Sequence, residues 1–531
     1  MTATRTRLTT LQDRIPMNFQ NRQPLGLRRD LTAGACAFAI AGVAINAVRP
    51  DDSVSTVALL LDLAVSLWAT IWVSVYAMLS IGSVIPGVRR MFAPDPAELV
   101  EPDPPVGSSG FRSGKRDWGF AILLALVCVG EWGTHGGERN GFLASSRPEA
   151  GMEDWTAADG YATVLDGHPA QGDGLFLLNL VGLFTAERPS ISGEFDRRAG
   201  HVWLASLLQR PLGSYWAFAL VNLAGWYASA IGVWWLGRHR WPQTWTGEIA
   251  SVMVATGQGF IFMSTAPQAH PAAFGAFVTG LVLFDRLSLW SLVQARRERW
   301  VAILGSAWMT GIAGLLYFGH IPLLLTTWIF GGPRMRVRSL VAVSAAAFAI
   351  VTAWQVIGET LLGLRFSGGN NDLAGGAIRI WLRIISEGGW SLRWQFHAGS
   401  IRGLLVGAFY YPWWILAIIG IFASPRRSRT WALAILAGTL LPAIAFSPQF
   451  RLPRAAYFAF PAVYLLAGAA IYMISQMIAT RVTSRDNHWR TAAGLVACAA
   501  VIACLAALTN LDLTGDQTFN VWFHEAQENR W

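Results

Sequence analysis

The sequence is poor in charge. Only 14% of its 531 residues are Asp, Glu, Lys or Arg, whereas a typical soluble domain has about 25%. Apolar runs of about 20 residues recur along the chain instead, and each is long enough to cross a bilayer core of about 30 Å. Such continuous runs exclude a β-barrel, whose strands give short alternating segments. We therefore expect an all-α fold, a polytopic integral membrane protein with about 13 transmembrane helices.

Several functional signatures are also missing. There is no phosphate-binding loop and no dinucleotide-binding glycine motif, so a nucleotide cofactor is not supported. No internal repeat is visible, which lowers the expectation of a secondary transporter. The cysteines lie in apolar segments, where cysteine behaves as a small hydrophobic residue, and none has metal-binding spacing or lies in a long loop. The four are Cys36, Cys128, Cys498 and Cys504.

The positive charge that the chain does have follows its membrane layout. The net charge is +9, but Arg and Lys cluster in short loops, as expected for cytoplasmic loops of membrane proteins. This pattern indicates topology and predicts membrane lipids, not nucleic acid, as the partner. It places the N-terminus in the cytoplasm and the protein in the cell (inner) membrane. The basic stretches include 238–240, 296–299, 334–338 and 426–429.

Apolar segments that cross the membrane in alternating directions, with basic loops on the cytoplasmic side, divide the chain into four parts. Residues 1–132 form the cytoplasmic N-terminus and the first three helices. Residues 133–213 form a long outer loop, periplasmic or extracellular. A helix bundle, 214–508, includes a second outer loop at 358–402, and an outer tail follows at 509–531. The eighth apolar segment, 320–332, is short, and its loss would reverse the orientation of everything after it.

The long outer loop gathers acidic residues and two short apolar stretches. The run GDGLFLLNLVGLF, residues 172–184, is apolar nearly all round and too short to span, so we expect an interfacial helix. Asp173 lies at its N-terminal end, where the helix dipole favours an ionised carboxylate. A second apolar helix is expected at about 199–209, preceded by Arg197 and Arg198, with His201 near its start.

The order of these features resembles the GT-C glycosyltransferases, polytopic enzymes that take a sugar from a polyprenyl-phosphate carrier. The stretch GDGLFLLNLVGLF resembles the Asp-Gly motif of their first outer loop, and EFDRRAGHVWLASLL resembles their later arginine and apolar helix. DGYATVLDGHP, residues 159–169, also resembles the Asp-Gly motif. The family usually places this loop after the first membrane helix, whereas three segments precede it here, and an added N-terminal hairpin would account for the difference.

The resemblance implies a hexosyl- or pentosyltransferase that works on the non-cytoplasmic face. Its donor would be a polyprenyl-phosphate sugar, and its acceptor a glycan, lipid or protein. A base must deprotonate the acceptor hydroxyl, and in the family this is an outer-loop aspartate. Asp173 is the first candidate and Asp159 the second. The alternative for Asp173 is a helix N-cap within a turn.

Cations on the outer side would stabilise the leaving phosphate. Arg197 and Arg198 meet this condition, as do Arg451 and Arg454, and the arginine fork matches phosphate oxygens. The alternative for these arginines is contact with lipid headgroups or with the loop acids. Candidates for hydrogen bonds to sugar or phosphate are histidines near outer helix ends, which are otherwise interface residues. These are His201, His270 and His320.

No cofactor is expected. The sequence has no tight Asp-x-Asp or His-x-x-x-His spacing, so we predict no metal site, although GT-C enzymes differ in this respect and the acidic loop leaves a divalent metal open. Two other functions compete with the enzyme. A transporter or lipid flippase would bury charge near the bilayer midplane, but Asp62, and Asp285 with Arg286, lie near helix ends. The third alternative is a non-catalytic subunit of a membrane complex.

Overall fold

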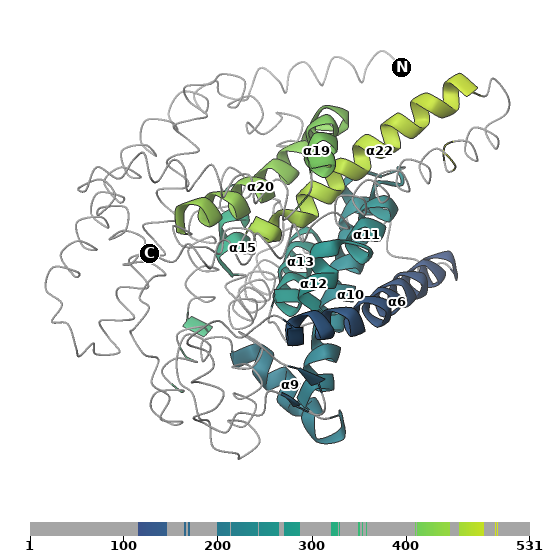
Figure 1. Ribbon diagram of the computed structural model, residues 1–531. Helices are drawn as coiled ribbons and strands as arrows, with labels where there is room; N and C mark the ends of the chain where they lie inside the picture. The colour runs from purple at the N-terminus through teal and green to yellow at the C-terminus, as the bar shows by residue number, and fades with distance from the viewer. Residues whose placement is uncertain are drawn as a thin grey trace, which may run out of the picture. The chain divides into compact units, whose positions relative to one another are not determined.

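The computed structural model describes about two-fifths of the chain (Figure 1). Several expected features lie outside the described residues: the first two apolar segments, the run 172–184, the second outer loop and the C-terminal tail. The described ranges are 115–145, 164–165, 168–169, 199–212, 214–242, 244–264, 270–286, 320–327, 411–446 and 456–482, with single positions at 329, 349, 350, 353, 357, 409, 494 and 496.

The described residues are almost entirely helical. Three of their helices are long and apolar enough to cross a membrane: Asp117–Thr134, Trp216–Arg240 and Tyr457–Thr480. This supports an integral membrane protein, and the count of about 13 spans stays a prediction. The helices are α6 (Lys115–Ser145), α9 (Ala199–Leu212), α10 (Ser214–Arg240), α11 (Thr246–Ala255), α12 (Gln258–Ser264), α13 (His270–Arg286), α15 (His320–Thr326), α19 (Tyr411–Ala423), α20 (Arg426–Phe446), the 3-10 helix η6 (Tyr457–Ala459) and α22 (Phe460–Val482).

Two details of the expected outer loop differ from a simple helical reading. Helix α6 continues to Ser145, beyond residue 132 where the apolar run ends, because hydropathy marks the membrane core and not the end of backbone hydrogen bonding. A small hairpin also forms, with β1 (Val164–Leu165) antiparallel to β2 (His168–Pro169). The residues between the strands are Asp166-Gly167, a dipeptide favoured in two-residue hairpin turns. Strands this short leave no alternating pattern that sequence reading could detect.

Helices α10, α11 and α13 pack closely through glycines. A methyl group added at Gly225 of α10 would come within 2.5 Å of the Ala272 Cα in α13. At the other end of the same two helices, Arg240 pairs with Asp285, so α10 and α13 run parallel. Helix α11 runs the opposite way, because Trp226 of α10 bonds to the carbonyl of Val254 and Gly237 lies against Gly247. These relative directions agree with the alternating directions expected for successive apolar segments, here the fourth (about 214–237), the fifth (about 247–266) and the sixth (about 270–290).

The C-terminal helices complete this packing. Gly468 of α22 lies close to Thr246 and Ala250 of α11, and Tyr457 lies against Gly259 of α12. Helix α22 is therefore antiparallel to α11 and α12. Helix α19 packs along α22, and the turn between α19 and α20 reaches the residue after α10, where the Trp241 indole donates to the Ser424 hydroxyl at 3.0 Å.

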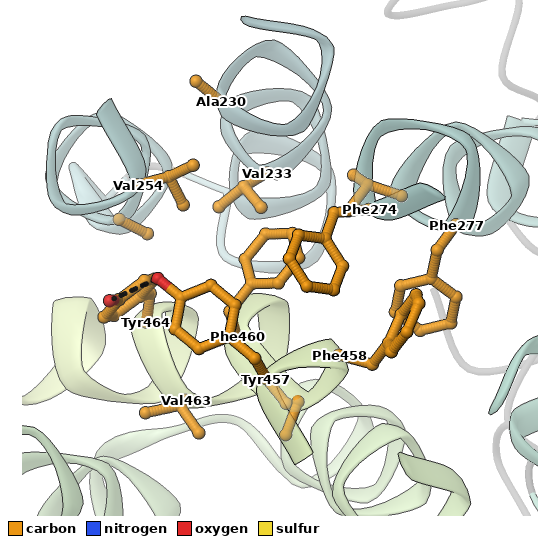
Figure 2. Close-up of a cluster of buried hydrophobic side chains, with 14 of the residues drawn as sticks. Ala230, Val233, Val254, Phe274, Phe277, Tyr457, Phe458, Phe460, Val463 and Tyr464 are labelled. Carbon is orange, nitrogen blue, oxygen red and sulfur yellow. Dashed lines mark hydrogen bonds between the residues drawn. The ribbon is translucent and has the colours of Figure 1, made fainter. Parts of the chain in front are cut away.

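An aromatic cluster fills the space between α12, α13 and the start of α22 (Figure 2). Its rings meet mostly edge to face, as aromatic pairs prefer. The ring centroids are 4.7 Å apart for Phe274 and Phe458, and 4.9 Å apart for Phe260 and Phe460. All of these side chains are buried. The cluster therefore fixes the start of α22 against the start of α13, and its members are Phe260, Phe274, Phe277, Phe409, Tyr457, Phe458 and Phe460.

Candidate functional site

Two of the expected site residues lie at the same end of the helix bundle. His201 of α9 has its Nε2 atom 3.0 Å from the Oδ1 atom of Asn222 in α10. His270 is the first residue of α13, and its neighbour Pro271 lies against Gly225. Asn222 and Gly225 are one turn apart, a rise of about 4.5 Å along α10. We call His201, Asn222 and His270 the histidine end of the bundle.

His201 lies on the inner face of the hairpin formed by α9 and α10. Its ring and the Asn222 side chain are both fully buried, and the ring centroid is 4.9 Å from that of Phe218. Val202 is buried beside it, whereas Leu207 is 59% exposed on the far side of α9. This two-sided pattern agrees with the expected helix at about 199–209. Contact of His201 with sugar or phosphate stays a prediction, since its Nε2 atom is engaged with Asn222.

His270 connects the histidine end to the aromatic cluster. It is fully buried, and its ring centroid is 6.2 Å from that of Phe274. Because Phe274 also touches Tyr457, at 5.4 Å between centroids, the first turn of α13 and the entrance to α22 lie together. The sixth and twelfth apolar segments, expected at about 270–290 and 454–476, correspond to α13 and α22. Their starts, which are their expected outer ends, thus meet through this cluster.

A break in the fifth segment lies beside the cluster. Helix α11 ends at Ala255 and α12 begins at Gln258, with Gly257 between them. A side chain at Gly257 would approach the Tyr464 hydroxyl to 3.2 Å, and the Tyr457 and Tyr464 hydroxyls are 3.4 Å apart (Figure 2). The Gly257 backbone N–H donates to the Val254 carbonyl oxygen at 3.3 Å, and its own carbonyl oxygen accepts from the Ile261 N–H at 3.0 Å. In a membrane a broken helix must find such partners for its freed backbone groups.

Sequence reading missed this break. The apolar run is continuous through residues 247–266, and Gly257 is a single glycine within it. An isolated glycine is only a weak signal of a helix end. The hydroxyl beside it comes from Tyr457, 200 positions later in the chain, which no local pattern reveals.

The remaining expected site residues are not placed. The side chain of His320, at the start of α15, is outside the described set. Among the described residues, no group of three or more His, Cys, Asp or Glu side chains could hold a metal ion, and the acidic loop is not among those residues. The candidates that lie outside the described residues are Asp159, Asp173, Arg197, Arg198, Arg451 and Arg454.

The opposite end of α10 holds a buried ion pair. The Nε atom of Arg240 is 2.8 Å from Oδ2 of Asp285, and a second guanidinium nitrogen bonds to the other carboxylate oxygen. The side chains are 4% and 0% exposed. The guanidinium carbon lies 5.3 Å from the centre of the Trp431 ring, and the Ser428 hydroxyl donates to the Arg240 carbonyl oxygen. Arg240 therefore joins α10, α13 and α20.

This pair bears on the transporter alternative. The sequence placed Asp285 beside Arg286, whereas the structure pairs it with Arg240, which lies 45 positions earlier. Arg240 is the last residue of α10, so the pair lies at helix ends. A neutral, fully bonded pair at that depth is typical of a structural clamp, while ion pathways bury charge deeper in the membrane. Within the described residues, the structure gives a transporter no support.

Comparison with known proteins found no matching protein-family model and no matching curated protein. Two solved structures are similar. The apo crystal structure of ArnT from Cupriavidus metallidurans has a TM-score of 0.39 and 14% identity, over 71% of this chain and 73% of that one. The crystal structure of the Archaeoglobus fulgidus oligosaccharyltransferase, tethered to an acceptor peptide with the NVT sequon, has a TM-score of 0.39 and 13% identity, over 78% of this chain and 55% of that one.

A TM-score of 0.39 does not establish a shared fold or activity. The function of this chain is therefore inferred from its own residues.

Proposed function

We propose that the protein is an integral membrane glycosyltransferase of the GT-C kind. It moves a sugar, a hexose or a pentose, from a polyprenyl-phosphate donor to an acceptor on the periplasmic or extracellular face of the cell membrane. The acceptor is a glycan, a lipid or a protein. Asp173 acts as the base on the acceptor hydroxyl, with Asp159 as the second candidate.

The observation that carries the proposal is the convergence of three chain segments at the histidine end. Arg198 directly precedes α9, which His201 ties to α10. His270 begins α13. Arg454 comes three residues before Tyr457, so its Cα lies within about 11 Å of the Tyr457 Cα by chain length alone. The starts of α9, α13 and α22 lie at one end of the bundle, and this supports the proposal that the motifs before them share one site.

This arrangement suits the chemistry of sugar transfer from a lipid phosphate. The departing phosphate gains negative charge as the sugar leaves, and cations held in place lower the energy of that state. Arg197, Arg198, Arg451 and Arg454 supply those cations in the proposal, while His270 and His320 offer hydrogen bonds. The tightly packed aromatic cluster at the start of α22 would limit movement of the chain that carries Arg451 and Arg454.

The proposal uses no cofactor, and a divalent metal bound by the acidic loop is a second possibility that the same assay can test. Adding EDTA to the reaction would leave the rate unchanged in the metal-free mechanism. A loss of rate that Mg²⁺ or Mn²⁺ restores would place a metal in the site and change the role of the loop carboxylates.

The test uses purified full-length protein in nanodiscs with a panel of polyprenyl-phosphate sugars, and it follows release of the lipid phosphate. Wild type should release it from one or more donors. The Asp173→Asn variant should still bind the donor but lose most of the rate, roughly 100-fold or more, because the base is gone. Glu187→Gln, which changes a carboxylate of the same loop that is not among the proposed site residues, is the matched control and should keep its rate.

The other outcomes separate the alternatives. Equal release by wild type and Asp173→Asn would keep the enzyme class and move the base to Asp159. If no donor is bound and none releases its lipid phosphate, the glycosyltransferase function is rejected. The transporter and the non-catalytic subunit then become the preferred functions.

A further inference from the structure

The bond between His201 and Asn222 is a polar contact inside an apolar helical hairpin. Both side chains are fully buried, and the Nε2–Oδ1 distance of 3.0 Å is that of a normal hydrogen bond. Apolar groups surround the pair: Val202 and Ala205 are 1% and 0% exposed, and the Phe218 ring lies against the imidazole. Breaking a hydrogen bond between two buried side chains is costly, because each loses a partner in a place where water does not readily replace it.

The pair therefore selects one register of α9 on α10. Apolar side chains still find apolar neighbours when one helix slides along another, so they specify register weakly. A slide of α9 by one turn, about 5.4 Å, would separate Nε2 from Oδ1 and leave both groups buried without this bond. Buried polar contacts of this kind are known to fix helix register.

The register of α9 decides where the paired arginines enter the bundle. Arg197 and Arg198 immediately precede the first residue of α9, Ala199. A shift of α9 along its axis moves that entry point by the same distance, which is larger than the tolerance of an arginine–phosphate contact. His201 lies only three residues after Arg198, close to the end of the helix that must be held.

We infer that His201 and Asn222 are positioning residues, which hold α9 in register and so keep Arg197 and Arg198 at the lipid-phosphate site. The inference rests on the proposed function, and it assigns Asn222 a role that the loop motifs do not contain. It also replaces direct substrate contact by His201 with an action through α9.

The test combines a structural and a kinetic readout on full-length protein in nanodiscs. Backbone hydrogen exchange of α9 should become roughly tenfold faster in His201→Leu and in Asn222→Leu, because each removes one half of a buried bond. The double variant should match the single variants and not exceed them. The KM for the lipid-linked donor should rise and kcat should fall in all three, with kcat/KM lower by roughly tenfold, since the displaced arginines both bind the donor and stabilise the departing phosphate.

Two further variants make the result specific. His201→Gln keeps a side-chain donor that can reach Asn222, so it should restore most of the exchange protection and most of the donor KM. Ser206→Ala removes a hydroxyl that bonds within α9, to the Trp203 carbonyl oxygen, and should change neither readout. If the Leu variants do not fold, His201→Ala and Asn222→Ala remove the same bond and give the same comparison.

The inference would be overturned if hydrogen exchange of α9 were unchanged in Asn222→Leu. It would also be overturned if the losses of exchange protection in the two single variants added in the double variant. A fall in kcat confined to the His201 variants would also overturn it and would favour direct contact of His201 with the substrate. Faster α9 exchange in a protein whose wild type releases no lipid phosphate from any donor would instead support the register role and reject the proposed function.

Discussion

The ion pair between Arg240 and Asp285 gives the sharpest prediction for stability. Its side chains are 4% and 0% exposed, and the two carboxylate oxygens both accept from the guanidinium. Asp285→Ala removes the carboxylate and leaves a buried guanidinium, whose carbon lies 5.3 Å from the centre of the Trp431 ring. The perturbation therefore removes the opposite charge that faces a buried cation, and not merely one hydrogen bond.

The expected cost is large. Removing one partner of a buried pair costs about 3–5 kcal/mol, which corresponds to roughly a 100- to 4,000-fold change in the unfolding equilibrium. The second ion pair of α10 provides the comparison. Arg238 bonds to Asp117 at 2.6 Å, but these side chains are 43% and 20% exposed. Water and neighbouring groups screen such a pair, and its loss should cost less than about 1 kcal/mol.

The assay is an unfolding titration in mixed detergent and SDS micelles, followed by circular dichroism. Asp285→Ala should lower the SDS fraction at the unfolding midpoint strongly, whereas Asp117→Ala should lower it only slightly. The double variant Arg240→Leu with Asp285→Leu should recover much of the loss, because no charge is left buried alone. Equal shifts for the two single variants would refute the reasoning, as would a double variant that is worse than Asp285→Ala.

Three further predictions concern packing, each measured by the same titration. Gly225→Ala should prevent normal assembly or lower stability markedly, because its methyl group would meet the α13 backbone. Gly119→Ala, with open space around it, should leave stability unchanged. Equal effects of the two variants would contradict the close crossing of α10 and α13. Phe274→Ala should cost about 3–5 kcal/mol, and Phe422→Ala, 76% exposed, much less; a reversed order would contradict the buried cluster. Tyr457→Phe should cost about 1–2 kcal/mol by removing the hydroxyl at the helix break, and no change would show that water or another group replaces it.

The sequence predicted the described helices well because their signal is local. The apolar runs at about 214–237 and 270–290, with the basic residues after them, gave α10 and α13 to within four residues at each end, whereas the run at about 454–476 begins and ends six residues before α22 does. The helix at about 199–209 was also predicted, and α9 spans Ala199–Leu212. What failed was detail that hydropathy does not encode, such as the break at Gly257 and the two-residue strands.

The partners of the buried polar groups were not predictable. Asp285 was considered with its chain neighbour Arg286, but it bonds to Arg240 on another helix. Asn222 looked like an ordinary residue of an apolar segment, yet it holds His201. Such pairings depend on helix crossing and rotation, which follow from close contacts like that of Gly225 with α13. Which loop aspartate is the base stays a prediction.

The spacing of contacts along the chain has a consequence for biosynthesis. Arg240 and Asp285 are 45 positions apart, so the cation can be neutralised as soon as α13 has entered the membrane. Phe274 must wait for Tyr457 and Phe458, which at about 5–20 residues per second are synthesised roughly 9–37 s after Phe274. The waiting face is aromatic, and lipid tails solvate it at little cost because they are themselves apolar. The charges of Arg240 and Asp285, which are costly inside a bilayer, are therefore paired early. The aromatic face at Phe274 completes its packing late, and lipid can cover it in the meantime.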